Sequence, residues 1–274
     1  MATIQIPADL ESVLNVAWQK TKKVPGHLLE NEARFLGLLA ACVPGAGTIV
    51  EIGSFKGRST VMLATVASHY GSGPVVAIDP HNSPILLDLA KSPEASTYQD
   101  FLNSINTAGV SHHVEPHLAY STEVAKTWKR PIRVLWIDGD HSYDGVKKDL
   151  EGFLPHPEPF GVVAMHDALN VCPGPIRVFV EDILRSDRFG PAGFVHSIAW
   201  AQFRPNDGDC FRKQRRTLDR SACRLIPFVQ DGKDLRGFAK KLYKFNRFCV
   251  PIRRLSPAPG HHYLWIPSNA ELDR

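Results

Sequence analysis

Short apolar runs alternate with amphipathic segments over most of this chain. Between about residue 32 and about residue 200, apolar runs of strand length are separated by segments in which apolar residues recur every three or four positions, as on one face of a helix. The runs that predict strands are 48–52, 74–78, 113–118, 132–137, 161–165 and 194–203, and the tail adds 262–267. The segments that predict helices are 32–42, 59–69, 96–108, 121–128, 143–154 and 175–186. Strands buried on both faces and joined by helices indicate an α/β fold with a doubly wound, mostly parallel sheet.

The composition supports a folded protein and excludes several classes. Hydrophobic residues make up 43% of the 274 residues and charged residues 22%, which allows a sizeable core and excludes global disorder. No apolar run approaches ~18 residues, so we expect no membrane-spanning helix, and the first residues lack the pattern of a signal peptide. The five cysteines are scattered without a Cys-x-x-Cys pair, which argues against a disulfide framework and a structural zinc site. We therefore expect a cytoplasmic protein.

The net charge of +4 conceals two regions of opposite sign. Residues 204–255 hold fifteen Lys and Arg against five Asp, so the remainder of the chain has a net charge of −6. In the basic region, four apolar residues recur at intervals of three and four beside the cations: Leu235, Phe238, Leu242 and Phe245. Residues 233–247 could form a helix that packs on the core, a peripheral helix on an anionic membrane surface, or a lid over an acidic sugar. We expect no nucleic acid as a partner, because no known binding motif accompanies the charge.

Acidic residues and a histidine lie at the ends of four predicted strands. Glu51 precedes the end of the first strand, Asp79 follows the second, Asp138 follows the fourth, and His166 and Asp167 follow the fifth. In sheets of this kind, ligands bind beyond the carboxyl ends of the strands, at the point where the strand order reverses. We therefore predict one shared site at this edge.

The segment Val50–Thr60 is glycine-rich but fits neither common phosphate-binding motif. Its glycines are one residue too close for a P-loop, and Phe55 stands where a dinucleotide fingerprint needs a glycine. What remains is a tight turn at Gly53 and Gly57 that lets a ligand approach the backbone. An acid 28 residues after Glu51, Asp79, is suitably placed to bind ribose hydroxyls. A nucleoside with a cationic tail fits these acids, and S-adenosylmethionine (SAM) is such a molecule.

Four sequence motifs then carry a specific resemblance. They are VEIGSFKGRST at 50–60, AIDPH at 77–81, WIDGDHSYDGVKKDL at 136–150 and VVAMHD at 162–167. Together they resemble class I SAM-dependent methyltransferases, in the branch similar to macrolide-sugar O-methyltransferases and cephalosporin hydroxylase-type proteins. The resemblance covers roughly residues 25–200 and implies a seven-stranded Rossmann-like methyltransferase fold, with a final antiparallel strand beside the fifth.

This resemblance implies roles for particular residues and a division of the chain. The residues expected to contact the methionine portion of SAM are Glu51, Gly53, Ser54 and Ser59; Asp79 is expected at the ribose, and Ser121 and Thr122 at the adenine. Tyr120 and Trp136 are expected in the core. The expected division is a helical lead-in (1–45), a cofactor-binding catalytic core (46–203), a basic insertion (204–260) and the final strand and tail (261–274).

The chemistry is expected at the ends of the fourth and fifth strands. Asp138 and Asp167 resemble the metal ligands of related metal-dependent methyltransferases, and their oxygens suit Mg²⁺. His166 stands where those relatives carry Asp or Glu. Its imidazole suits Mn²⁺, Fe²⁺ or Zn²⁺ better, or it binds substrate with no metal present. His141 matches the general base of catechol-type enzymes; its alternative role is to cap the next helix or to bond the Asp140 carboxylate.

We therefore predict a SAM-dependent O-methyltransferase, in which Asp138 and His141 activate a hydroxyl of a small molecule or glycan and a divalent metal assists. Two alternatives stay open: a metal-dependent hydroxylase or lyase on the same fold, and a non-catalytic cofactor-binding protein. The acceptor and the metal are not specified by the sequence, and neither is the formation of a homo-oligomer.

Overall fold

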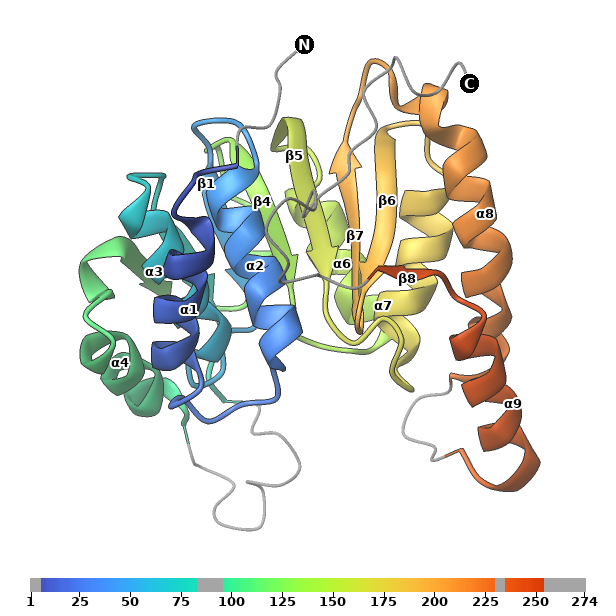
Figure 1. The fold of residues 1–274 in the computed structure, drawn as a ribbon, viewed down its shortest axis with the longest axis horizontal. Helices are drawn as coiled ribbons and strands as arrows, with labels where there is room; N and C mark the ends of the chain where they lie inside the picture. The colour runs from blue at the N-terminus through green and yellow to red at the C-terminus, as the bar shows by residue number, and fades with distance from the viewer. Residues whose placement is uncertain (1–5, 83–95, 230–234, 254–274) are drawn as a thin grey trace.

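A computed structural model describes residues 6–82, 96–229 and 235–253 of the chain (Figure 1). The strands are β1 (Thr48–Ile52), β2 (Val75–Ile78), β3 (Val114–His117), β4 (Ile132–Ile137), β5 (Pro157–Met165), β6 (Phe189–Val195), β7 (Ile198–Phe203) and β8 (Ile252–Arg253). The α-helices are α1 (Leu10–Thr21), α2 (Glu30–Cys42), α3 (Arg58–His69), α4 (Tyr98–Thr107), α5 (Ser121–Ala125), α6 (Tyr143–Phe153), α7 (Pro173–Val178), α8 (Arg212–Ala222) and α9 (Gly237–Phe248). Shorter helical turns are η1 (Ser111–His113), η2 (Phe179–Leu184), η3 (Gly208–Phe211) and η4 (Cys223–Phe228).

The strands of the described chain form one sheet in the order β3-β2-β1-β4-β5-β7-β6-β8. The five strands from β3 to β5 run parallel, β7 is antiparallel to both β5 and β6, and β8 adds a short parallel edge to β6. Every residue of β1, β2 and β4 is buried, because helices cover both faces of the sheet. The predicted doubly wound, mostly parallel Rossmann-like sheet is confirmed, and β8 is an eighth strand that we did not predict.

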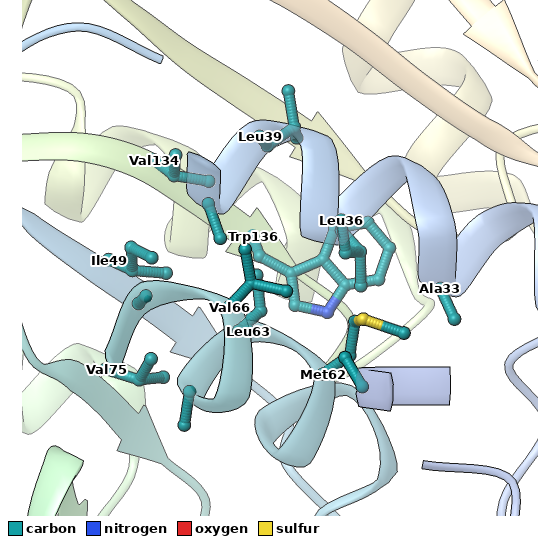
Figure 2. Packing of buried hydrophobic residues seen from close by; sticks show 14 of the residues in the cluster. Ala33, Leu36, Leu39, Ile49, Met62, Leu63, Val66, Val75, Val134 and Trp136 are labelled. Carbon is teal, nitrogen blue, oxygen red and sulfur yellow. The ribbon is translucent and has the colours of Figure 1, made fainter. Parts of the chain in front are cut away.

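Alternate side chains of the strands enter two separate cores. On one face, Val134 and Trp136 of β4 pack with α1, α2 and α3; on the other, Leu135 and Ile137 pack with α6, α7 and α8. Figure 2 shows the Trp136 ring among side chains of α2 and α3, and Trp136 is fully buried, as predicted. This packing fixes the position of α2 over β4, which matters for the site.

The predicted sixth strand, 194–203, is wrong. The structure has a hairpin there, in which β6 and β7 are joined by the polar pair His196 and Ser197. His196 has φ +52°, which a two-residue turn requires and which an asparagine or histidine tolerates better than most residues. Both strands are buried throughout and apolar except for Gln202, so the hydrophobic pattern did not reveal the reversal.

The hairpin also corrects the predicted place of the basic region. The antiparallel neighbour of β5 is β7, not the tail segment 262–267, which lies outside the described residues. The basic region therefore follows the antiparallel strand rather than being inserted before it. Its described part consists of η3, α8, η4, α9 and β8, and β8 returns to the sheet. Across the described ranges, we find no helix with the length and apolar character needed to cross a lipid bilayer.

Candidate active site

The predicted site lies at the carboxyl ends of the parallel strands, where the order of the sheet reverses between β1 and β4. Two backbone hydrogen bonds hold this edge together. The amide of Gly53 donates to the carbonyl of Ile78 at 2.9 Å, and the amide of Asp138 donates to the carbonyl of Ile52 at 2.8 Å. The ends of β1, β2 and β4 are thus fixed relative to one another, as expected for a ligand site in an open α/β sheet.

Gly53 is required by the geometry of this edge. It has φ +86°, a conformation that residues with a side chain rarely adopt. A Cβ at this position would also lie 2.3 Å from the carbonyl oxygen of Asp138. The glycine therefore allows the turn that follows β1 to contact the loop that follows β4. The predicted cofactor turn and the predicted catalytic loop are in direct backbone contact.

Glu51 lies beneath this turn and is fully buried. The hydroxyls of Ser59 and Thr60, at the start of α3, donate hydrogen bonds to its two carboxylate oxygens. Burial raises the pKa of Glu51 to about 8, although these two hydrogen bonds oppose the shift. Thr60 was not among the predicted residues, although it directly follows Ser59 in the motif.

Ser54 gives an independent indication that the turn accepts a ligand. Its hydroxyl oxygen is buried and has no hydrogen-bond partner among the described residues. A buried hydroxyl without a partner is costly, so a polar ligand group at the turn would satisfy it. This observation fits the predicted contact between Ser54 and the methionine portion of SAM.

Asp79 and the start of α5 complete the predicted cofactor residues. Asp79 accepts hydrogen bonds from the amides of Phe55, at 2.8 Å, and His81, at 2.7 Å, so it also fixes the glycine turn. Ser121 donates its hydroxyl to Asp149, and burial raises the pKa of Asp149 to about 6. Thr122 is exposed at the same helix start.

The prediction for Tyr120 is wrong. We expected it in the core, but 52% of its surface is exposed, and its hydroxyl accepts a hydrogen bond from Asn82 at 3.1 Å. It lies at the N-cap of α5, just after the short β3.

The four predicted catalytic and metal-binding residues do lie together. Asp138 Oδ1 is 3.0 Å from His166 Nδ1 and 3.4 Å from His141 Nε2. Asp167 Oδ1 is 3.7 Å from His166 Nδ1, and Asp167 Oδ2 is 3.8 Å from His141 Nδ1. Two imidazoles thus lie between two carboxylates, an arrangement that can hold protons or a cation and release them.

Glu32 is the residue that sequence analysis missed. It lies in α2, within the predicted lead-in, and its Oε2 is 3.3 Å from His166 Nε2. Its other oxygen accepts a hydrogen bond from the Ser197 hydroxyl and lies 2.9 Å from His196 Nδ1, in the β6–β7 turn. Only 1% of its surface is exposed. The available signal was a carboxylate on the otherwise apolar face of an amphipathic helix.

The charges of this cluster shift its proton affinities strongly. Burial alone would lower the pKa of His166, but the negative charge of Asp138 and contacts with Asp138 and Glu32 raise it to about 11. Burial also opposes the shift at His141, where the hydrogen bond to Asp138 raises the pKa to about 10. Despite its burial, Asp138 has a lowered pKa, because both histidines stabilise the carboxylate. In the protein without ligands, both imidazoles therefore carry a proton at neutral pH.

A second grouping, which we did not predict, includes a thiol. Among the described residues, the ligand atoms of His141, Asp167 and Cys172 lie within 4.8 Å of one another. The amide of Gly174 donates to the carbonyl of His141 at 3.0 Å, and a Cβ there would lie 2.3 Å from the carbonyl of Ser142. This close approach brings the thiol to 3.8 Å from His141 Nδ1. Ligand atoms of a tetrahedral site are ~3.5 Å apart, so the three ligand atoms would have to move closer together to hold a divalent cation.

The motif segment and the fold both have counterparts among known proteins. Residues 50–168 match the family model described as a methyltransferase domain. The structure of the O-methyltransferase NovP covers 71% of this chain and 98% of its own, with 16% identity and a TM-score of 0.53. TomG of Streptomyces achromogenes, an O-methyltransferase involved in tomaymycin synthesis and solved with SAM, covers 73% and 92%, with 20% identity and a TM-score of 0.50.

A third solved structure has a similar relation to this chain. The O-methyltransferase of Bacillus cereus, solved with S-adenosylhomocysteine (SAH), has 22% identity and a TM-score of 0.50, and the match covers 74% of this chain and 94% of that one. At these identities the likeness concerns the fold.

The raised pKa of Glu51 leads to a testable dependence of stability on pH. The folded protein keeps this proton up to about pH 8, whereas an unfolded glutamate loses it near its ordinary value of 4.5. Between these values the folded state binds more protons, so the free energy of unfolding falls as pH rises. We expect Glu51→Gln to remove on the order of 1–3 kcal/mol of this fall, as measured by urea unfolding from pH 5 to pH 8.

The control for this measurement is Glu151→Gln, which changes a glutamate whose side chain is 63% exposed. Its unfolding curves should follow the wild type at every pH. If Glu51→Gln and the wild type lose stability in parallel between pH 5 and pH 8, Glu51 is ionised in the folded protein.

Proposed function

The order of the sheet and the match of residues 50–168 assign the chain to the class I methyltransferases. On this premise, we propose that the protein is a SAM-dependent O-methyltransferase. The proposed acceptor is a hydroxyl of a small molecule or a glycan, with a sugar as first choice. The observation that carries the proposal is the direct contact between the glycine turn and the loop after β4, at Gly53 and Asp138. A bound methyl donor and a group that takes up protons would therefore lie side by side.

The glycine turn supplies the donor part of this proposal. SAM, when bound, would supply a methyl group on a positively charged sulfur. Glu51, Ser54 and Ser59 surround the turn, and Asp79 holds its backbone while leaving acceptor capacity for ribose hydroxyls. A cation near Glu51 would favour the ionised form of that buried carboxyl. Ser121 and Thr122 stay the proposed residues for the adenine side.

The loops after β4 and β5 supply the acceptor part. The acceptor hydroxyl gives its proton to the imidazole of His141 while its oxygen forms a bond to the methyl carbon. The carbon–sulfur bond breaks, and its electron pair stays on sulfur, which leaves SAH. Asp138 orients His141 through Nε2, and the gain comes from holding the oxygen and the methyl carbon in line. The proton that His141 carries in the ligand-free protein must leave first.

A divalent cation is the proposed assistant of this step. The proposed ligands are Asp138, His166 and Asp167, and the geometry adds His141 and Cys172 to the groups within reach. A cation here would hold the acceptor hydroxyl and lower its pKa. Oxygen ligands suit Mg²⁺, whereas imidazole and thiolate suit Zn²⁺ or Co²⁺ better.

Cofactor binding is tested with Asp79→Ala. We expect calorimetry to show SAM binding in the wild type and a loss of about 1–3 kcal/mol in the variant, because charged hydrogen bonds to the ribose are removed. Asp144→Ala, which removes an exposed aspartate, is the control and should bind SAM as the wild type does. Equal or tighter binding of NAD or ATP by the wild type would reject the assignment.

The base is tested with His141→Ala in an assay of SAH production from a panel of hydroxyl acceptors. We expect turnover to fall by about 10²–10⁴-fold with little change in SAM affinity. Because the pKa of His141 is about 10, wild-type turnover should rise with pH from 7 towards 10, and the variant should lack this rise.

The control here is His112→Ala, an exposed histidine on η1 outside the site. Unchanged turnover in His141→Ala would remove the residue from the mechanism. Acceptor conversion without SAH would favour the hydroxylase or lyase alternative, and SAM binding without any conversion would favour a non-catalytic protein.

The metal is tested by exhaustive chelation followed by stepwise return of Mg²⁺, Mn²⁺, Zn²⁺ or Co²⁺. We expect SAH production to fall on chelation and to return with one of these ions. With Co²⁺, a thiolate ligand adds near-ultraviolet absorption, which Cys172→Ser should abolish and Cys249→Ser, at an exposed thiol, should retain. Full turnover after chelation would contradict the metal proposal and leave His141 as the sole group that activates the acceptor hydroxyl.

A further inference from the structure

Helix α9 exposes its apolar residues to solvent. The exposed fractions are 78% for Phe238, 36% for Leu242, 62% for Phe245 and 87% for Phe248. Scattered exposed apolar residues need no explanation, but four on one short helix do. Of the predicted stripe, Leu235 packs against the core, but Phe238, Leu242 and Phe245 do not, so the hypothesis of a core-facing helix does not agree with the exposures on α9.

A single buried side chain, Tyr243, instead fixes the helix to the protein. Its hydroxyl donates hydrogen bonds to the carbonyls of Leu169, at 2.9 Å, and Asn170, at 2.8 Å. At about 100° per residue, Phe238, Phe245 and Phe248 lie about 140–160° around the helix from Tyr243. The apolar stripe therefore faces away from the protein, at the end of the molecule where Figure 1 shows α9.

The charged residues of the same helix are all positive. Residues 235–253 contain six Lys and Arg and no Asp or Glu. Lys240, Lys241 and Lys244 are exposed; at about 100° per residue, Lys240 and Lys244 lie on one side of the stripe and Lys241 lies within it. A short amphipathic helix with phenylalanines on one face and lysines within and beside that face has the composition of a helix that lies in a membrane interface. Its twelve residues are too few to span a bilayer.

The attachment of α9 also connects this surface to the active site. Leu169 and Asn170, which accept the hydrogen bonds of Tyr243, belong to the loop that carries Asp167. The side chain of Asn170 in turn donates to Asp167 Oδ1. One tyrosine thus links the exposed helix to the loop that we assign to acceptor activation.

We propose that α9 binds an anionic lipid surface, with Phe238, Phe245 and Phe248 inserted among the headgroups and Lys240, Lys241 and Lys244 facing lipid phosphates. Lipid is the occupant that this surface favours, because an apolar stripe on a helix whose charged residues are all cations complements a negatively charged, apolar layer. The loop that holds Asp167 then lies on the opposite side of α9 from the lipid, one helix diameter (~10 Å) away. If the protein transfers methyl groups as proposed above, this position makes a hydroxyl compound attached to lipid the class of acceptor.

Co-sedimentation of the full chain with vesicles tests the proposal. We expect binding to phosphatidylcholine vesicles that contain phosphatidylglycerol, little binding to phosphatidylcholine alone, and loss of binding at high salt, where exposed charges are screened. Replacing Phe238, Phe245 and Phe248 together by Ser, or Lys240, Lys241 and Lys244 together by Glu, should each weaken binding at least roughly tenfold.

The matched control applies the same charge reversal to α8, at its exposed residues Lys213, Arg216 and Arg220. Because net charge changes equally, this variant should keep most of the binding if α9 is the binding surface. Circular dichroism of all variants should match the wild type, since the changed side chains are exposed. Binding lost equally in the α8 and α9 variants would show attraction by net charge alone and overturn the proposal.

Two measurements distinguish failure of this proposal from failure of the proposed function. SAH production from a soluble acceptor should be unchanged in the α9 variants. If the wild type ignores anionic vesicles but produces SAH, only the membrane proposal fails; a dimer in sedimentation equilibrium that the phenylalanine variant dissociates would then identify a second copy as the occupant. If vesicles bind but no SAH forms, only the reaction fails.

Discussion

Three largely buried groups of alternating charge determine how the active-site edge is assembled: the carboxylate of Glu32, the imidazolium of His166 and the carboxylate of Asp138. Glu32 comes from α2, Asp138 follows β4, and His166 follows β5; the β6–β7 turn adds Ser197 on Glu32. Removing one partner of such a buried group leaves an uncompensated charge, which typically costs about 3–5 kcal/mol. The helix, the two parallel strands and the hairpin must therefore keep their relative positions.

This constraint also determines the state of the residue next to it. Asp138 is shared, because its Oδ1 faces His166 on the buried side and His141 on the open side. The buried imidazolium of His166 lowers the pKa of Asp138, and the resulting carboxylate raises the pKa of His141. The proton affinity of the partly buried His141 is thus set by Asp138 and, through Asp138, by the buried His166.

The same edge explains why one short loop can serve several purposes. The segment after β5 holds Asp167 in a left-handed conformation, with φ +54°, and fixes one of its oxygens through Asn170. Its carbonyls at Leu169 and Asn170 accept the hydroxyl of Tyr243 from α9. Gly174 then brings Cys172 against the loop after β4. Hydrogen bonds to the backbone of this segment, together with the burial of Ala168 and Leu169 in the core, therefore position this part of the site.

The sequence by itself determined the parallel strands, the glycine turn and the group of polar residues at one edge. Each depends on local patterns: buried strands read as apolar runs, and a glycine turn directly follows its strand. Since all parallel strands end at one edge, residues far apart in the chain, such as Glu51 and Asp138, could be assigned to one site. Their roles toward cofactor, base and metal stay predictions.

Only the tertiary structure decided the rest. Two adjacent apolar strands are indistinguishable from one long strand until their partners are known, so the β6–β7 hairpin was missed. Glu32 and Cys172 joined the site through elements distant in sequence, and no local period encodes such contacts. The stripe on α9 had the spacing of a core-facing helix, yet Tyr243 alone is buried there. Periodicity reveals that a helix has two faces, whereas the packing of the surrounding elements decides which of them is covered.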